Sequence, residues 1–201
     1  MHKYTTTFLQ PIIASADIDQ NNLQISQASL DSLKTLMPES IDLDKNIDLV
    51  GVAFNAAVVN KFNRNHDGIG TDTALAVKDY FVHKPTNIEH KKQRIVGHIV
   101  SAAFSSYGDN ELVSDEELRE TKDPFNIALG AVVYRMVDKK FAELINQSVD
   151  PESPLHNQVS ASWEIGFNDY QIALGSEDLS EAEIVTDEKQ IKELSQYLKA
   201  A

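Results

Sequence analysis

The stretch that decides the fold is Gln158–Phe167, with the sequence Gln-Val-Ser-Ala-Ser-Trp-Glu-Ile-Gly-Phe. Apolar residues occupy its odd-numbered positions, and small or polar residues occupy the even-numbered positions between them. Alternation with a period of two is typical of a β-strand that is buried on one face. The open face of this strand would present two hydroxyls and a carboxylate, from Ser160, Ser162 and Glu164. The pattern describes an ordinary edge strand and equally a rigid platform for a serine nucleophile.

The composition limits the class of protein. The chain has 201 residues, of which 42% are hydrophobic, so it can bury the core of a single domain. It carries 31 acidic and 18 basic side chains, a net charge of −13, which disfavours nucleic-acid binding because phosphates are repelled. Cysteine is absent, which excludes a disulfide framework, a thiol nucleophile and a Cys-type zinc site. Neither a signal-peptide pattern nor a membrane-spanning apolar run occurs, so we expect a cytoplasmic protein without membrane association.

The rest of the chain predicts an α+β domain with a mainly antiparallel sheet of about six strands and three to four surrounding helices. Beside the opening stretch, strands are expected at Tyr4–Ala14, Leu49–Val59, Ile95–Phe104, Asn126–Tyr134, Asp169–Leu174 and Ala182–Val185. Helices are expected at residues 30–37, 71–81, 138–149 and 186–200. The strand at Asp169–Leu174 is predicted to form a hairpin with the opening strand. Thr186 is predicted to be the N-cap of the last helix.

Two segments differ in charge from their surroundings. Val82–Arg94 holds four of the 18 basic residues and two of the six histidines. Ser105–Asp123 holds seven acidic and two basic residues, which is typical of a solvated flap. Within the flap, Ser114 and Glu117 have the spacing of a capping box, which predicts a short helix.

The motifs of several enzyme classes are absent. The chain has no GxGxxG, phosphate-binding loop or GxSxG sequence, and no histidine pair with the spacing of zinc proteases. Asp67-Gly68 lacks the flanking ligands of a calcium loop. We therefore expect neither a cofactor nor a metal. What remains is a serine on a strand and a histidine, His90, on a basic loop before a buried strand. Nucleophilic catalysis by serine requires such a base, and the loop cations could offset charge on a tetrahedral intermediate.

Five stretches of the chain, taken together and in order, resemble segments of one known family. They are Ala57-Val-Val-Asn-Lys-Phe-Asn63, Ala76-Val-Lys-Asp-Tyr80, Asn87-Ile-Glu-His90, Arg94-Ile-Val-Gly-His-Ile99 and Val159–Phe167. The family is the prohead (capsid maturation) proteases of tailed phages. The first two stretches resemble its early strand and helix, the next two its histidine segment, and Val159–Phe167 its serine segment. The resemblance covers about Leu49 to Leu174, with the segments in matching order.

The resemblance implies a fold and a site. The family is similar to the herpesvirus assembly proteases, whose fold is a mainly antiparallel barrel carrying helices. Carried over residue by residue, Ser162 is the nucleophile and His90 the base, while Ser160 is the competing serine on the same face. The third catalytic group is left open between His98 and Glu164. The implied substrates are phage scaffold or core proteins and the major capsid protein, inside the assembling prohead in the host cytoplasm. Herpesvirus relatives dimerise, so homo-oligomerisation is also expected.

The implied domain organisation is a single protease-like domain over residues 1–201, with a core at 49–174 and a terminal helix at 186–200. Relatives continue beyond this helix with a Gly-rich turn and further strand sequence. An end at Ala201 therefore suggests a shortened or self-processed form. Two alternatives remain. One is a non-catalytic head scaffold or core protein that retains the fold, and the other is a housekeeping hydrolase of unrelated fold, for which no motif is present.

Overall fold

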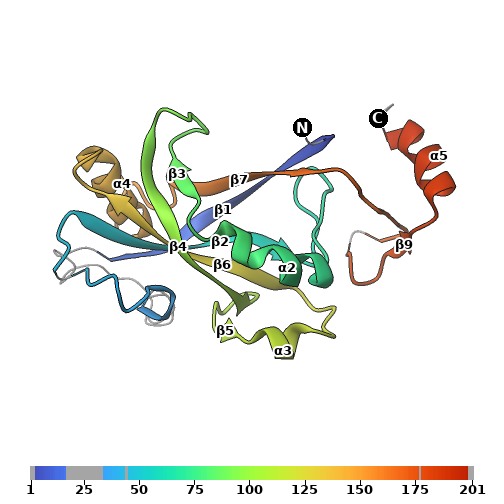
Figure 1. Ribbon diagram of the computed structural model, residues 1–201, viewed down its shortest axis with the longest axis horizontal. Coiled ribbons are helices and arrows are strands. Elements are labelled where there is room, and N and C mark those ends of the chain that lie inside the picture. Colours follow the sequence, from blue (N-terminus) through green and yellow to red (C-terminus); the bar gives the residue numbers. More distant parts are fainter. Residues whose placement is uncertain (1–2, 17–33, 44, 177, 199–201) are drawn as a thin grey trace.

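The computed structural model describes residues 3–16, 34–43, 45–176 and 178–198 (Figure 1). The strands are β1 (Tyr4–Ala16), β2 (Leu49–Val59), β3 (Pro85–Asn87), β4 (Ile95–Ser106), β5 (Leu112–Val113), β6 (Phe125–Tyr134), β7 (Ser160–Phe167), β8 (Ile172–Leu174) and β9 (Glu183–Val185). The helices are α2 (Thr71–Val77), the 3₁₀ helix η2 (Lys78–Phe81), α3 (Asp115–Leu118), α4 (Lys139–Val149) and α5 (Glu188–Leu198).

One curled antiparallel sheet dominates the fold. Its strand order is β3-β4-β6-β2-β1-β7, and the short β5 pairs with β4 beside this path. The remaining strands, β8 and β9, pair with each other in a separate two-stranded sheet. The predicted α+β class and the antiparallel sheet of about six strands are therefore confirmed. The opening stretch of the sequence becomes β7, at one end of the strand path, and β3 lies at the other end.

The middle of the sheet is made by β4, β6 and β2. Nearly every residue of β6 is buried, because β6 pairs with β4 on one side and β2 on the other and both of its faces are covered. This explains why its sequence, like that of β4, is apolar without alternation. Gly97 is required in β4, since a Cβ there would lie 1.9 Å from the carbonyl oxygen of Val132 in β6.

An aromatic cluster of three rings lies beneath β7 and is centred on Trp163. Its indole ring stacks on Phe8 of β1 with centroids 5.2 Å apart, and it meets Phe81 edge-on at 4.6 Å. The indole Nε1 donates a hydrogen bond of 2.8 Å to the carbonyl oxygen of Ala56. The register of β2 against β6 shifts between Asn55 and Ala57, so Ala56 sits in a bulge. A bulged residue is left out of the regular ladder, which leaves its carbonyl group available to the indole.

Most of the predicted elements occur close to their expected positions. The strand at Leu49–Val59 is confirmed to the residue, and Ser114 and Glu117 form the expected capping box at the start of α3. The helix expected at 71–81 is present, but its last turn, Lys78–Phe81, is 3₁₀ rather than α-helical. Of the helix predicted at 30–37, residues 30–33 lie outside the described residues, and residues 34–36 are helical.

Two predictions about the C-terminal part are wrong. The strand at Ile172–Leu174 pairs with β9 and not with β7. Tyr170 packs edge-on against Tyr4, with centroids 5.0 Å apart, and its hydroxyl contacts the Ser195 hydroxyl at 2.6 Å. These contacts hold the chain beside α5 instead of returning it along β7. The N-cap of α5 is Asp187 rather than Thr186, because the Asp187 carboxylate accepts a hydrogen bond of 2.9 Å from the backbone N–H of Gln190.

The helices are short and lie around the sheet. Over the described parts of the chain, none is both long and apolar enough to cross a lipid bilayer. The longest, α4 and α5, have 11 residues each, and both are amphipathic. Helix α4 packs against β1 and β6, whereas α5 lies at the opposite end of the molecule's long axis (Figure 1).

Replacing the central indole should destabilise the protein strongly. We expect Trp163→Ala to lower the free energy of unfolding by about 3 kcal/mol, because it removes a large ring from the core. Trp163→Phe keeps ring packing but loses the hydrogen bond to Ala56, so a smaller loss of about 1–2 kcal/mol is expected. Urea unfolding followed by circular dichroism measures both. Tyr80→Ala, at an exposed aromatic residue, is the control and should change stability by less than about 0.5 kcal/mol. Equal losses in all three variants would contradict this account of the core.

Candidate active site

Ser162 lies on the outward face of β7. Inward-facing Trp163 and Ile165 pack against the main hydrophobic core, so the intervening side chains point away from it. Ser160, Ser162 and Glu164 are all exposed, as the alternation predicts. On the neighbouring strand β1, Leu9 is paired directly with Ser162 and is 62% exposed. A peptide could therefore approach the Ser162 hydroxyl from solvent.

His90 lies in the turn that connects β3 to β4. The turn is closed by backbone hydrogen bonds from Ile88 N–H to the Arg94 carbonyl oxygen (3.2 Å) and from Lys91 N–H to the Ile88 carbonyl oxygen (3.1 Å). Glu89 and His90 both have left-handed backbone conformations, with φ of 54° and 55°. Two consecutive residues other than glycine in this region cost about 1–2 kcal/mol each. The backbone conformation that orients the His90 side chain is therefore unfavourable by itself.

The curl of the sheet brings this histidine to the serine. The Nε2 atom of His90 lies 3.1 Å from the Oγ atom of Ser162, within the range in which a general base accepts a proton. The two residues are 72 positions apart in sequence, and they belong to opposite ends of the strand path, the β3–β4 turn and β7. Figure 1 shows the β3–β4 turn rising beside the first half of β7. The pair exists because the sheet curls, although its end strands β3 and β7 are not hydrogen-bonded to each other.

A second hydrophobic cluster supports both sides of this contact. It is centred on α4 and the ends of β2, β4 and β6. Ile88, two residues before the histidine, and Val159, three residues before the serine, both pack against it. One cluster therefore positions the turn and the start of β7 relative to each other.

The two candidates for a third catalytic group lie in different surroundings. His98 is on β4, and its Nδ1 atom lies 2.7 Å from the hydroxyl of Tyr134 on β6. Glu164 follows Ser162 on the same face of β7 and is paired with Thr7 of β1. Among the described residues, neither is hydrogen-bonded to His90. Nor do three His, Asp or Glu side chains gather there in a way that could hold a metal ion.

The turn also carries fixed charges. The Glu89 carboxylate accepts a hydrogen bond of 2.5 Å from the Lys91 ammonium group. This bond, the charge of Lys91 and, more weakly, the charge of Arg94 lower the pKa of Glu89 below its usual value. Arg94 in turn lies 3.5 Å from the Asp138 carboxylate at the start of α4. The residues on both sides of His90 are thus charged and paired.

Sequence reasoning missed two contacts of the predicted site residues. Leu9, opposite Ser162, could have been found from the segment Thr5-Thr6-Thr7-Phe8-Leu9, where Phe8 faces the core and Leu9 must therefore face outward. Tyr134, the partner of His98, carried no signal, because the register between β4 and β6 shifts by a bulge between Ile99 and Ser101. That shift does not follow from the sequence pattern.

In comparisons with known proteins, no protein-family model, no curated protein and no solved structure matches the chain.

The support given by α4 can be tested at Asp138, whose carboxylate accepts a hydrogen bond of 3.0 Å from the backbone N–H of Phe141. Asp138→Ala removes this cap and the contact with Arg94, and should lower the free energy of unfolding by about 1–2 kcal/mol. Asp138→Asn keeps a capping oxygen and should cost no more than about 0.5–1 kcal/mol. Glu143→Ala, on the exposed side of the same helix, is the control and should lower the free energy of unfolding by about 0.5 kcal/mol or less. Thermal or urea unfolding distinguishes them, and an Asp138→Asn loss as large as that of Asp138→Ala would contradict the capping role.

Proposed function

We propose that this protein is a viral prohead serine endopeptidase, which cleaves scaffold or core proteins and capsid proteins during maturation of the head. The observation that supports this most is the approach of His90 Nε2 to Ser162 Oγ at 3.1 Å. The same two residues are the ones that the resemblance to prohead proteases assigns to catalysis. The curled antiparallel sheet agrees with the barrel expected of that family.

The proposed reaction uses the serine–histidine pair in two steps. Ser162 Oγ attacks the carbonyl carbon of a peptide bond while His90 Nε2 takes the hydroxyl proton. Collapse of the tetrahedral intermediate breaks the C–N bond, and the protonated His90 returns the proton to the leaving amine, which leaves an acyl-enzyme on Ser162. Water, deprotonated by His90, then hydrolyses the ester and regenerates the hydroxyl. Neither step needs a metal or a cofactor.

The exposure of the site fits a macromolecular substrate. Ser162 and His90 both lie on the surface rather than in a deep cavity, so an extended segment of another protein could reach them. The proposed substrates are phage scaffold or core proteins and the major capsid protein, and the proposed location is the assembling prohead in the host cytoplasm. Self-cleavage belongs to the same proposal.

One observation favours a second candidate, a non-catalytic scaffold or core protein with the same fold. His98, a candidate for orienting His90, bonds to Tyr134 instead, and no other described residue is hydrogen-bonded to the second ring nitrogen of His90. A base without an orienting group is a weaker catalyst. The two candidates share the fold and differ in the reactivity of Ser162.

The choice of nucleophile predicts the outcome of two alanine variants. Ser162→Ala should lower the rate of cleavage of co-expressed head proteins by roughly a thousandfold or more, since it removes the attacking oxygen. Ser160→Ala, two residues away on the same exposed face, is the matched control and should retain cleavage. Gel electrophoresis and mass spectrometry of the products give the rates, and circular dichroism checks that both variants fold. Persistent cleavage in Ser162→Ala together with loss in Ser160→Ala would reverse the assignment.

Covalent labelling separates the enzyme from the scaffold. A fluorescent serine-reactive phosphonate should label the native chain at Ser162, and His90→Ala should slow labelling by roughly a hundredfold or more, because the base activates the hydroxyl. His156→Ala, a substitution at a histidine outside the β3–β4 turn, is the control and should label at the native rate. Tandem mass spectrometry locates the adduct. Absence of labelling in the native chain would favour the second candidate, a non-catalytic scaffold or core protein.

A further inference from the structure

A second candidate site lies far from the serine–histidine pair, in a small lobe formed by β8, β9 and α5. We define this lobe as residues 169–198. Figure 1 places α5 at the end of the long axis opposite to α4, the helix whose cluster supports the β3–β4 turn. The lobe contacts the body through Tyr170, which packs on Tyr4 of β1, and through an isolated antiparallel bridge between Asp178 and Lys61. Tyr170 also contacts Ser195 of α5.

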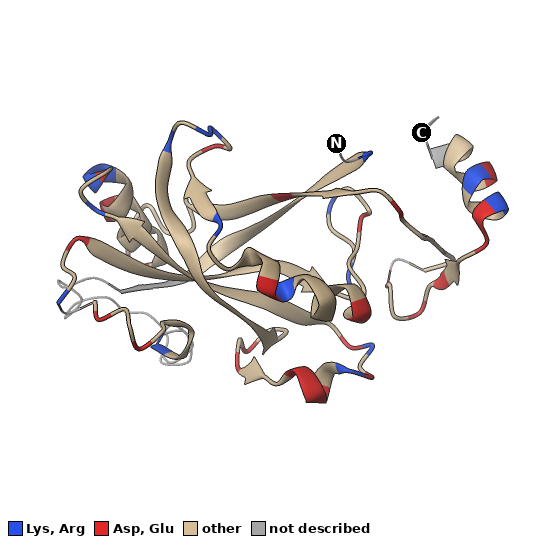
Figure 2. Cartoon of the chain, viewed as in Figure 1, with Lys and Arg blue, Asp and Glu red and all other residues tan. Residues whose placement is uncertain are grey.

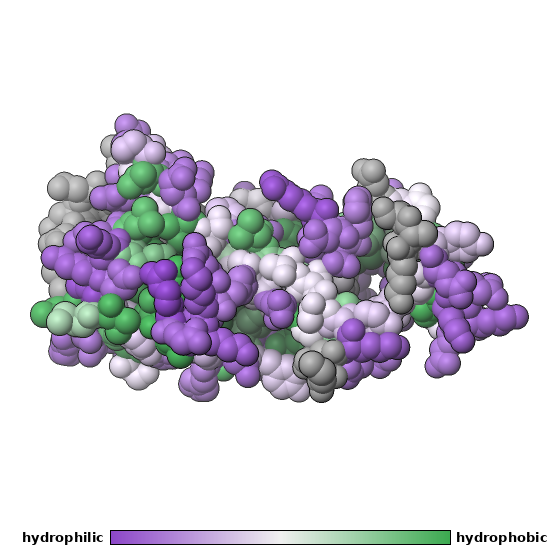
Figure 3. Space-filling view, turned by 90° about the horizontal axis from the view of Figure 1, so that it is seen from above, coloured by the Kyte–Doolittle hydropathy of each residue, from purple (hydrophilic) through white to green (hydrophobic). Residues whose placement is uncertain are grey.

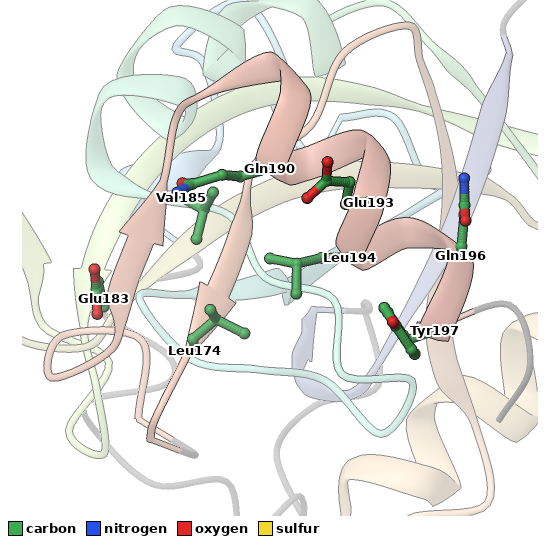
Figure 4. A pocket seen from close by; sticks show the side chains of 8 residues that line it. All are labelled: Leu174, Glu183, Val185, Gln190, Glu193, Leu194, Gln196 and Tyr197. Carbon is green, nitrogen blue, oxygen red and sulfur yellow. The ribbon is translucent and has the colours of Figure 1, made fainter.

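A pocket of mixed polar and apolar lining opens between α5 and the β8–β9 hairpin (Figure 4). Its volume is about 410 Å³, which is enough for one or two large side chains. Its apolar walls are formed by Leu174, Val185, Leu194 and Tyr197. Its polar lining consists of Glu183, Gln190, Glu193 and Gln196. Hydrophobic walls with a few polar groups are typical of ligand and peptide sites.

The apolar surface of the lobe is incompletely covered. Tyr197 is 77% exposed, and Leu174 and Ile184 are 40% and 41% exposed. The β8–β9 ladder is three residue pairs long, and neither strand pairs with the main sheet. An isolated two-stranded sheet is only marginally stable, so a partner that packed on it would add to its stability. Of these exposed side chains, Tyr197 and Leu174 line the pocket and form one docking surface with it, whereas Ile184 lies between the lining residues Glu183 and Val185 and faces the other side of β9.

The charge of the lobe determines which partner fits. Residues 169–198 contain eight Asp or Glu and two Lys, a net charge of −6 within a chain whose total is −13. Figure 2 shows acidic residues along the hairpin and at the start of α5, and Figure 3 shows a mostly hydrophilic surface at this end. The two charged residues in the pocket lining are both acids, Glu183 and Glu193. Within the described part of the chain, neither forms an ion pair.

We propose that this pocket binds a Lys- or Arg-rich segment of a partner protein that also carries large apolar residues. The aliphatic stem of a lysine or arginine would lie along Leu174 and Leu194, as such stems do on apolar surfaces. Its cationic head would reach Glu183 or Glu193, and the Tyr197 ring offers a cation–π contact. Acidic peptides and nucleic acids are disfavoured because the lobe repels them. The inference is independent of the proposed protease activity.

Fluorescence anisotropy tests the proposal with the full chain carrying Ser162→Ala, so that the probe is not cleaved. The probe is the fluorescein-labelled peptide Gly-Lys-Leu-Lys-Ala-Arg-Leu-Lys-Gly. We expect saturable binding that weakens roughly tenfold when the salt concentration rises from about 50 mM to about 300 mM, since exposed charges are screened. A peptide with Glu in place of every Lys and Arg should not bind. A peptide with Ser in place of both Leu should bind roughly tenfold more weakly.

Variants locate the site. The double variant Glu183→Gln/Glu193→Gln should weaken binding roughly tenfold, and Tyr197→Ser should weaken it roughly fivefold or more. Both changes are at polar or exposed positions, and circular dichroism verifies folding. The matched control, Glu143→Gln/Glu152→Gln, removes two acidic charges outside the lobe and should leave affinity within about twofold.

Three results would overturn the proposal. The first is the absence of saturable binding of the basic peptide. The second is equal weakening by the lobe variant and the control variant, which would mean nonspecific attraction to an acidic chain. The third is sedimentation showing that Tyr197→Ser abolishes self-association, because the occupant would then be a second copy of the chain.

Discussion

The candidate site depends first on the packing of one side chain, the indole of Trp163. Side chains alternate across a strand, so packing of the partly buried indole against the core forces Ser162 to the outer face. A register slip of one residue would turn the serine into the core. The indole N–H extends past β1 and donates a hydrogen bond to the carbonyl oxygen of Ala56 in β2. That carbonyl group is available because Ala56 lies in a bulge. The bulge in the central strand β2 thus helps to hold the end strand β7, which pairs only with β1, in its register.

The second requirement is the curl of the sheet, which places the β3–β4 turn beside β7. The histidine is not directed by its own turn alone, since two left-handed residues other than glycine are unfavourable there. Packing of Ile88 and Val159 against a shared cluster offsets this cost. Chemistry at the Ser162 hydroxyl would therefore depend on long-range packing.

Local sequence patterns predicted where the strands and helices lie. Tertiary contacts decided which strands pair and which side chains meet. Alternation located β7, and the capping-box spacing located α3, because both signals lie within a few residues. The pairing of Ile172–Leu174 was missed, since a turn-forming sequence does not specify the partner strand, and Tyr170 packs against the distant Tyr4. Alternation predicted that Ser162 is exposed, and the basic segment before the apolar strand at Ile95 predicted a loop for His90. The prediction that the two meet came from the resemblance and not from spacing, because no local sequence pattern encodes how a sheet curls to join residues 72 positions apart.

The net charge of −13 is spread unevenly along the chain, so it does not describe any one surface. Nearly half of it belongs to the 30-residue lobe, residues 169–198, at the far end of the long axis from α4. The turn around His90 is different, because Val82–Arg94 has four basic residues and one acid. Exposed charges are screened over about 10 Å at moderate ionic strength, so each surface responds to its own residues rather than to the total. The field at the serine–histidine pair is therefore set by charged residues of its own turn, among them Lys91, Arg94 and Glu89, and not by the net charge of the chain.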